Sequence, residues 1–255
     1  MKTLSVHLIP VLSDNYIFVL RDEVSNLTIC VDPAEGPPVV KFLEQKGWTL
    51  GYILITHHHP DHIGGIEFLK AKYQAKVFAG VHDQHRIQAD HYLKDNEKIF
   101  LDTHEVKILF LPGHTMGHIA YYFETEMLLF CGDVLFSLGC GRLFEGTPDQ
   151  MLHSLQRIKL MPDKMKIYCT HEYSQQNAHF ALAVEPNNKA LINRVAEING
   201  LRASNISTIP TTLKSELECN PFLRAHSPEI RNNIEKKDAT DLEVFTELRL
   251  RRNSF

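Results

Sequence analysis

The chain has 255 residues, of which 44% are hydrophobic and 23% charged, and its 27 basic and 31 acidic side chains give a net charge of −4. This length exceeds the common domain size of about 100–150 residues and fits one large domain or two unequal ones. The acidic balance offers no polycationic surface for nucleic acid, and no apolar run approaches the roughly 20 residues that cross a bilayer.

Cysteine usage and the first residues indicate a reducing compartment. The five cysteines are odd in number and lack CxxC spacing, which is typical of free thiols. The first twelve residues hold a lysine, a histidine and a proline in or beside their apolar stretch and make a poor secretory signal. We therefore expect a cytoplasmic monomer with no membrane association and no nucleic-acid partner.

Up to about residue 170, short apolar runs alternate with turn signals, which is typical of β-strands. We expect strands over residues 5–11, 16–20, 28–31, 52–56, 77–79, 106–111, 119–123, 127–131 and 166–170. Helical periodicity predicts helices over 37–45 and 63–73. Another helix should begin after Thr147, which precedes Pro148 and can form a capping box with Gln150. Its expected buried stripe is Met151, Leu152, Leu155 and Ile158.

After residue 170 the pattern becomes helical. We expect helices over 174–184, 189–204 and 238–252, with an irregular stretch over 205–224 that contains Pro210 and Asn220-Pro221. The pair Glu185-Pro186 should end the first of these helices. Strands in runs and then interleaved with helices predict face-to-face sheets with helices outside. We therefore divide the chain into a domain of residues 1–173 and a small, mostly helical domain of residues 174–255.

Residues 53–62 read ILITHHHPDH, an apolar run long enough for a buried strand that leads directly into polar side chains. Loops at strand ends are where functional groups stand on a rigid scaffold. Imidazole nitrogen and carboxylate oxygen suit Zn²⁺, and also iron and manganese. His57, His59, Asp61 and His62 supply more donors than one catalytic ion with an open position can use. This segment predicts a metal site. The alternative interpretation is a His-rich surface loop that binds no metal.

The same arrangement recurs at three later points of the chain. His114 follows the apolar run and Pro-Gly turn of residues 109–113, Asp133 follows residues 127–132, and His171 follows residues 167–170. Each expected strand thus ends in a residue type that can bind a metal. Four such strand ends in one chain favour the metal site over the accidental loop.

The segments THHHPDH (56–62), PGHTMGH (112–118), CGDVLF (131–136) and THEY (170–173) resemble the metallo-β-lactamase superfamily. The segments GCGRLFEGT (139–147), NPFLR (220–224) and Arg249-x-x-Arg252 bring the resemblance closest to glyoxalase II, the hydroxyacylglutathione hydrolases. The resemblance covers essentially the whole chain. It implies an α+β fold, an αββα metallo-β-lactamase-like sandwich followed by a small, mostly helical C-terminal domain.

The resemblance also implies a site for two divalent metal ions, with Zn²⁺ expected first and iron or manganese as alternatives. One ion would be held by His57, His59 and His114, the other by Asp61, His62 and His171, and both by Asp133. His58 is expected to turn away from the metals and His118 to stand behind the ligands. The other histidines are expected at the surface or at caps: His7, His82, His85, His91, His104, His153, His179 and His226.

The implied reaction cleaves S-(2-hydroxyacyl)glutathione, chiefly S-D-lactoylglutathione, to glutathione and D-lactate, the second step of methylglyoxal detoxification. Asp61 and Asp133 would act with a metal-bridging hydroxide, since two ions lower the pKa of a shared water towards about 7 and polarise the carbonyl. A thiolate leaving group, whose conjugate acid has a pKa of about 8.5, departs without a strong general acid.

Glutathione carries two carboxylates, which guanidinium groups bind bidentately. The family pattern assigns substrate contacts to Arg142, Phe144, Tyr173, Arg249 and Arg252. Arg142 and Phe144 replace a lysine and a tyrosine of some family members, so the charge is kept and one hydroxyl is lost. The alternative for the two terminal arginines is a solvated basic tail.

Other functions remain as alternatives. A mononuclear iron persulfide dioxygenase of the same fold needs only two histidines and one carboxylate, so the complete second ligand set argues against it. A metallo-β-lactamase usually lacks a carboxylate at the Asp133 position, and an RNase Z-like nuclease wants a basic phosphate-binding surface. A non-catalytic metal-binding protein is disfavoured because no ligand position is missing.

Overall fold

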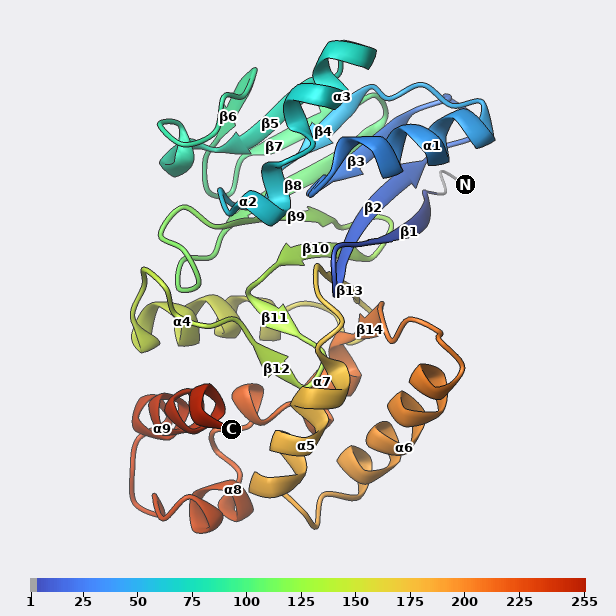
Figure 1. The fold of residues 1–255 in the computed structure, drawn as a ribbon. Helices are drawn as coiled ribbons and strands as arrows, with labels where there is room; N and C mark the ends of the chain where they lie inside the picture. Colours follow the sequence, from blue (N-terminus) through green and yellow to red (C-terminus); the bar gives the residue numbers. More distant parts are fainter. Residues whose placement is uncertain (1–3) are drawn as a thin grey trace. The chain divides into compact units, whose positions relative to one another are not determined.

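The computed structural model describes residues 4–255. The chain forms two compact units (Figure 1). We call residues 4–110 and 116–132 the N-terminal unit, and residues 111–115 and 133–255 the C-terminal unit.

The N-terminal unit is built from two groups of hydrogen-bonded strands. The first group is β1 (Ser5–Val11), β2 (Asn15–Arg21), β3 (Thr28–Val31), β4 (Tyr52–Leu54), β5 (Lys76–Gly80) and β6 (His91–Leu93). Its first three strands pair antiparallel, and β3 to β6 pair parallel. The second group is an antiparallel meander of β7 (Lys98–Leu101), β8 (His104–Phe110), β9 (Ile119–Phe123) and β10 (Leu128–Gly132).

Apolar side chains join the layers of this unit. Between the two strand groups, the Phe18 and Phe130 rings lie 5.5 Å apart, and the Tyr121 hydroxyl donates to the main-chain oxygens of Ile55 and Phe78. Burial raises the pKa of Tyr121, with Asp32 adding to the rise. On the other face of the first sheet, α1 (Gly36–Lys46) and α3 (Ile66–Tyr73) contribute side chains to a buried apolar cluster (Figure 1). The layers expected from the strand pattern are therefore present.

The helix expected over 63–73 is divided into α2 (Pro60–Ile63) and α3, and a short 3₁₀ turn, η1 (Val81–Asp83), follows β5. The break lies at Gly64 and Gly65, where the Pro33–Gly36 main chain comes close. A Cβ on Gly65 would lie 2.7 Å from the carbonyl carbon of Glu35, so only glycine fits there. The separate helix α2 begins at Pro60, and two expected ligands, Asp61 and His62, lie in its first turn.

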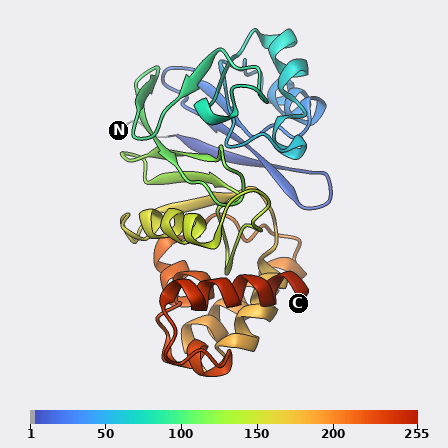
Figure 2. The same cartoon turned by 90° about the vertical axis from the view of Figure 1, so that its left-hand side faces the viewer.

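The C-terminal unit is mostly helical. Its strands are the hairpin β11 (Leu135–Phe136) and β12 (Gly139–Cys140), and the pair β13 (Lys166–Cys169) and β14 (Thr211–Thr212). Its helices are α4 (Pro148–Lys159), α5 (Ser174–Val184), α6 (Lys189–Ala203), α7 (Leu213–Cys219), η2 (Pro221–Leu223), α8 (Pro228–Asn233) and α9 (Asp241–Ser254). The last helix, red in Figure 2, packs against α4 and η2.

Most predicted helices are confirmed, and one expected loop is wrong. Thr147 caps α4 with the expected capping box, and Glu185 ends α5. Leu152 is only half-buried, and Ser154 faces inward instead and donates to the Pro112 carbonyl oxygen at 2.7 Å. The irregular stretch 205–224 contains β14, α7 and η2, since pairing with β13 and the Thr212 cap supply order that local sequence does not announce.

Across residues 4–255, none of the helices has both the length and the apolar composition of a membrane span. The boundary near residue 173 stays a prediction.

Candidate metal centre

The segment that follows β4, a loop that leads into α2, gathers four potential ligands in the N-terminal unit. His57 and His62 are fully buried, and their rings lie 4.0 Å apart. The Nε2 atom of His57 lies 3.0 Å from Nδ1 of His59, and Nε2 of His62 lies 3.8 Å from a carboxylate oxygen of Asp61. Imidazole nitrogens and a carboxylate therefore converge within one short segment, a donor set that fits a divalent ion.

Asp32 positions two of these histidines, His62 directly and His57 through Thr56. Its carboxylate accepts hydrogen bonds from the Thr56 main-chain N–H and hydroxyl, both at 2.8 Å, and lies 3.0 Å from Nδ1 of His62. The Thr56 hydroxyl in turn lies 3.0 Å from Nδ1 of His57. A hydrogen bond at one ring nitrogen fixes the tautomer and leaves Nε2 as the metal-binding atom. Asp32 thus orients both His57 and His62.

Asn15 holds the carboxylate of the loop. Its side-chain amide donates to Asp61 Oδ2 at 3.0 Å and approaches the Asp61 carbonyl oxygen at 3.4 Å. Asn15 is buried at the first position of β2, so a rigid strand supports this contact. The arrangement sets the direction of the Asp61 side chain, which is about one-third exposed.

The two histidines that we expected outside the ligand set have separate surroundings. His58 lies 3.2 Å from Asp83 and from Arg86, so its ring nitrogens have partners outside the expected ligand set. His118 is fully buried and its ring stacks on His57 at 4.7 Å. A Cβ on residue 132 would lie 2.7 Å from His118 Nε2, which explains the glycine there.

His104 corrects the expectation of surface positions for the remaining histidines. It is buried between two carboxylates, with Nε2 2.9 Å from Asp22 and Nδ1 2.6 Å from Glu126. The hydrogen bond to His104 is the main cause that lowers the pKa of Asp22 to about 2, against burial. Periodicity gave no sign of this cluster, because its members come from three segments that are far apart in the chain.

The C-terminal unit contains the other three expected ligands, two histidines that flank one carboxylate. The Nε2 atoms of His114 and His171 each lie 3.4 Å from Asp133 Oδ2. All three side chains are buried. One carboxylate flanked by two imidazoles is a donor set that a divalent ion can use.

Main-chain and aromatic groups position these ligands. Nδ1 of His114 lies 2.8 Å from the Arg142 carbonyl oxygen, which leaves Nε2 directed at Asp133. The Tyr173 ring stacks on His171 at 4.8 Å with an interplanar angle of 3°. A Cβ on Gly141 would lie 1.9 Å from the Asp133 carbonyl oxygen, so this tight path of the chain requires glycine.

Arginines on α9 and after β12 form a cationic cluster in the same unit. Arg249 is buried, donates to the Cys140 carbonyl oxygen at 2.7 Å and lies over the Phe222 ring. Arg252 is half-buried and donates to Asn177 at 3.2 Å. Burial and then the Arg249 charge lower the pKa of Arg252. A buried guanidinium and its half-buried neighbour place positive charge within the fold, so this segment is not a solvated tail.

The remaining expected substrate contacts lie at the edge of this cluster. Arg142 is exposed and approaches Asn253 at 3.4 Å, and its charge also lowers the pKa of Arg252. Tyr173 also lies near Arg252 and raises the pKa of that guanidinium. Phe144 is 61% exposed, and its ring lies 5.3 Å from that of His114. An exposed aromatic ring beside an expected ligand can contact a bound organic molecule.

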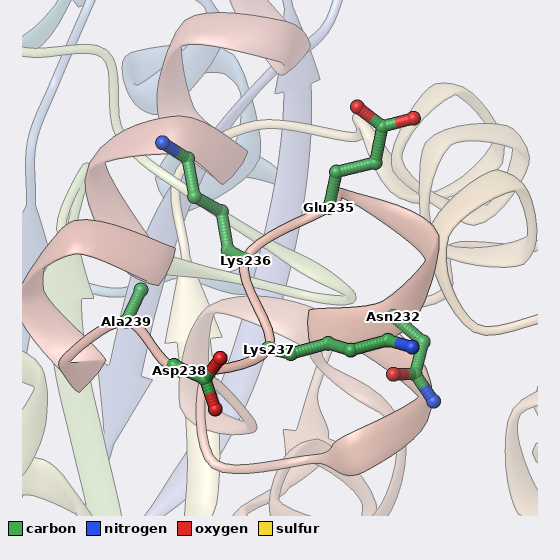
Figure 3. A pocket seen from close by; sticks show the side chains of 6 residues that line it. All are labelled: Asn232, Glu235, Lys236, Lys237, Asp238 and Ala239. Atoms are coloured by element: carbon green, nitrogen blue, oxygen red, sulfur yellow. The ribbon is translucent and has the colours of Figure 1, made fainter.

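A pocket in the loop between α8 and α9 belongs to a different part of the C-terminal unit (Figure 3). It is lined by Asn232, Glu235, Lys236, Lys237, Asp238 and Ala239. None of these is an expected site residue. Two lysines and two acidic residues of a surface loop present mixed charge and no convergent set of polar groups.

Sequence reasoning missed Asp32, Asn15 and Asn177. Asp32 follows the buried strand β3 just as the expected ligands follow their strands, and that shared pattern could have revealed it. Asn15 and Asn177 carry no comparable signal. Their roles depend on which side chains the fold brings to them.

Comparison with known proteins adds family and fold. The metallo-β-lactamase superfamily model matches residues 14–171, and the model of the hydroxyacylglutathione hydrolase C-terminus matches residues 172–255. A hydroxyacylglutathione hydrolase of Methylococcus capsulatus is 47% identical over 97% of each chain.

Two crystal structures share the fold. ETHE1 from Myxococcus xanthus is 21% identical with a TM-score of 0.68 and covers 98% of this chain and 99% of its own. BLEG-1 B3 metallo-β-lactamase is 22% identical with a TM-score of 0.68 and covers 86% of this chain and 100% of its own. The expected fold class, an αββα metallo-β-lactamase-like sandwich with a small helical C-terminal domain, is confirmed.

Proposed function

The chain belongs to the hydroxyacylglutathione hydrolase family of the metallo-β-lactamase superfamily, and on this premise we propose that it hydrolyses S-(2-hydroxyacyl)glutathione, chiefly S-D-lactoylglutathione. The products are glutathione and D-lactate. The family resemblance identified from the sequence is thereby confirmed, and the chain is an enzyme of the hydrolase class.

One observation within the C-terminal unit carries the substrate proposal. The ring of Tyr173 stacks on His171 and lies 5.3 Å from that of Phe136, in the β11–β12 hairpin whose Cys140 carbonyl oxygen accepts from Arg249. Metal donors and guanidinium groups therefore belong to one connected set of side chains. A substrate with a reactive carbonyl and remote carboxylates has both kinds of group, and a glutathione thioester is such a molecule.

The metal ligands form the next part of the proposal. One ion is assigned to His57, His59 and His114, the other to Asp61, His62 and His171, and both to Asp133. The donor set fits, because each unit on its own brings imidazole Nε2 atoms beside a carboxylate. Zn²⁺ is the ion that we propose first, since nitrogen and oxygen donors in a buried site suit it, with iron and manganese as alternatives.

Two bound divalent ions would supply a Lewis acid for the thioester carbonyl and lower the pKa of water at the site. The chain's own part is to orient the donors and hold the substrate. Asp32 fixes the tautomers of two histidines, and Asn15 directs Asp61. Departure of the thiolate requires no strong acid from the protein, because a thiol has a pKa of about 8.5.

Substrate binding is assigned to Arg142, Tyr173, Arg249 and Arg252, with Phe144 as an apolar contact. Arg249 already donates to the Cys140 carbonyl oxygen, so its other nitrogens and the Arg252 guanidinium are the groups offered to a carboxylate. Charge-assisted hydrogen bonds of this kind are about twice as strong as neutral ones. This set gives affinity for the carrier, whereas the metal ligands serve the acyl group.

We also propose that the protein is a cytoplasmic monomer. All five cysteines are free and buried, which favours a reducing compartment. Light scattering on the purified protein tests the monomer, and fractionation of the source cells tests the location.

The deciding experiment combines metal analysis with a thiol-release assay. We expect two ions per chain and rapid release of free thiol from S-D-lactoylglutathione, abolished by a chelator and restored by Zn²⁺. A carrier lacking the glycine carboxylate should react more slowly. One iron per chain with oxygen consumption on glutathione persulfide would favour a dioxygenase instead, and metal binding without turnover would favour a non-catalytic protein.

A further inference from the structure

The C-terminal unit contains a buried carboxylate that has no part in the proposed chemistry. Glu216 on α7 is fully buried. Its Oε2 accepts from the Leu138 main-chain N–H at 2.8 Å, and its Oε1 accepts from the Thr211 hydroxyl at 2.7 Å. Burial raises the pKa of Glu216, although these hydrogen bonds oppose the rise. Burying a carboxylate costs free energy, so the groups that Glu216 contacts indicate which part of the fold it stabilises.

Asn220 extends the same network into the NPFLR segment. Its side-chain amide lies 2.9 Å from Glu216 Oε2 and donates to the carbonyl oxygens of Phe136 and Gly139 at 3.1 and 2.9 Å. Both acceptors belong to the β11–β12 hairpin. Glu216 and Asn220 together therefore bind three main-chain groups of one hairpin.

This hairpin could not keep its shape alone. Each strand has two residues, and Leu138 in its turn has φ 59°, a conformation that a leucine rarely adopts. Isolated two-stranded hairpins are marginal in water even when they are longer. The Leu138 N–H is also the group that Glu216 accepts from, so the buried acid stabilises the unusual turn directly.

The far end of the hairpin leads into the cationic cluster. The Cys140 carbonyl oxygen accepts from Arg249 at 2.7 Å, and the Gly141 carbonyl oxygen lies 3.5 Å from the same nitrogen. Arg142 follows directly. On the other side, Asn177 donates to the Ser137 carbonyl oxygen at 3.0 Å and accepts from Arg252. A shift of the hairpin would therefore move all three guanidinium groups.

We propose that Glu216 is a positioning residue for carboxylate recognition: with Asn220 it holds the β11–β12 hairpin so that Arg142, Arg249 and Arg252 face one anion. Glu216 does not touch the substrate. The proposal rests on the proposed function, because the anion is a carboxylate of the thiol carrier. It assigns a role to the NPFLR segment, which the metal chemistry leaves unused.

Two substitutions test the proposal. Glu216→Leu keeps the approximate volume and removes all three acceptor contacts. Glu216→Gln keeps an acceptor for Leu138 and can donate to the Thr211 hydroxyl, so it should restore the hairpin. Glu218→Leu is the matched control, since Glu218 lies exposed on the same helix.

The measurements are KM and kcat for the thioester, metal content, and the dissociation constant of S-methylglutathione by calorimetry on the metal-loaded protein. In Glu216→Leu we expect KM and the dissociation constant to rise about tenfold, the loss of one charge-assisted hydrogen bond. We expect kcat within about threefold and unchanged metal content. Glu216→Gln and Glu218→Leu should bind as the unchanged protein does.

A second ligand separates positioning from general loosening. S-methylglutathione with both carboxylates converted to amides should bind the unchanged protein and Glu216→Leu equally weakly. An equal loss for both ligands, or an unchanged dissociation constant for S-methylglutathione, overturns the proposal. Should Glu216→Leu not fold, Thr211→Val removes one contact, and a rise of less than about twofold there overturns it as well. Failure of the unchanged protein to bind S-methylglutathione contradicts the proposed function itself.

Discussion

The two units assemble their metal donors by different means. In the N-terminal unit, four donors come from one segment of six residues after β4. Side chains hold them: Asp32 contacts the histidines and Asn15 contacts Asp61. In the C-terminal unit, three donors come from three separate segments, and Asp133 lies between two imidazoles. The main-chain carbonyl of Arg142 and the ring of Tyr173 hold those imidazoles.

This difference determines which substitutions should disturb the metal donors of each unit. A donor fixed by a side chain loses its orientation when one residue behind it is replaced. A donor fixed by a carbonyl oxygen keeps its partner after any substitution and loses it only when the main chain moves. The donors of the N-terminal unit should therefore be sensitive to single substitutions of the residues that hydrogen-bond to them. Those of the C-terminal unit should be sensitive to changes that shift its loops.

The largest effect should come from the carboxylate at the centre of the C-terminal half. Asp133→Ala removes the donor that we assign to both ions, so we expect the loss of both and a fall in kcat/KM of more than about 10³-fold, beyond the 10–100-fold typical of groups behind ligands. Metal analysis and the thiol-release assay measure these losses. Asp163→Ala, at an exposed position of the same unit, is the control. Two ions retained by Asp133→Ala would refute the shared role.

The sensitivity of the N-terminal half is tested by Asp32→Asn. An amide cannot accept from the Thr56 N–H, the Thr56 hydroxyl and His62 as a carboxylate does, so metal affinity should fall about 10–100-fold. Competition with a chelator measures it. Asp102→Asn is a close control, because Asp32 and Asp102 have φ of 49° and 56° and Asp102 is exposed. Equal affinity in both variants would show that Asp32 does not orient the ligands.

Substrate contacts of the C-terminal half should change binding more than chemistry. Arg252→Ala removes a charged hydrogen-bond donor, so KM should rise about tenfold while kcat stays within about threefold. Arg251→Ala is the control, since Arg251 pairs with Glu247 on the same helix. Steady-state kinetics on S-D-lactoylglutathione give both constants. A fall in kcat with KM unchanged would place Arg252 outside the carboxylate site.

The smallest effect on activity should come from the buried His104 cluster of the N-terminal unit. His104→Phe leaves two carboxylates without their common partner and should lower the free energy of unfolding by about 3 kcal/mol at pH 7. Its kcat/KM should stay within about twofold, because the cluster involves none of the ligands. Urea denaturation measures the first quantity. A stability equal to that of the unchanged protein would contradict the role of this cluster.

The same cluster gives a pH dependence with a definite sign. The pKa of Asp22 is lowered from 3.8 to about 2, chiefly by His104, so its ionised form stabilises the folded state above pH 4. That contribution is lost as the pH falls from about 4 to 2. In His104→Phe the main cause of the lowered pKa is gone, and the difference in stability between the two proteins should narrow over this range.

Much of the fold follows from local patterns. Apolar runs between turn signals located most strands of the N-terminal unit, and the capping box at Thr147 located the start of α4. The stretch 205–224 was mispredicted because β14 consists of two residues that form a strand only by pairing with β13. Likewise, the helix expected over 63–73 is broken by the approach of a distant main chain to Gly65.

The sequence by itself determined which residue types could bind metal and where strands deliver them, since both depend on side-chain chemistry and on periods of a few residues. The tertiary structure alone decided that Asp32 supports His62, that Arg249 is buried against Cys140 and that Glu216 holds a hairpin. These contacts join residues far apart in the chain. Their energy arises from burial and hydrogen-bond geometry, which no local pattern of amino acids encodes.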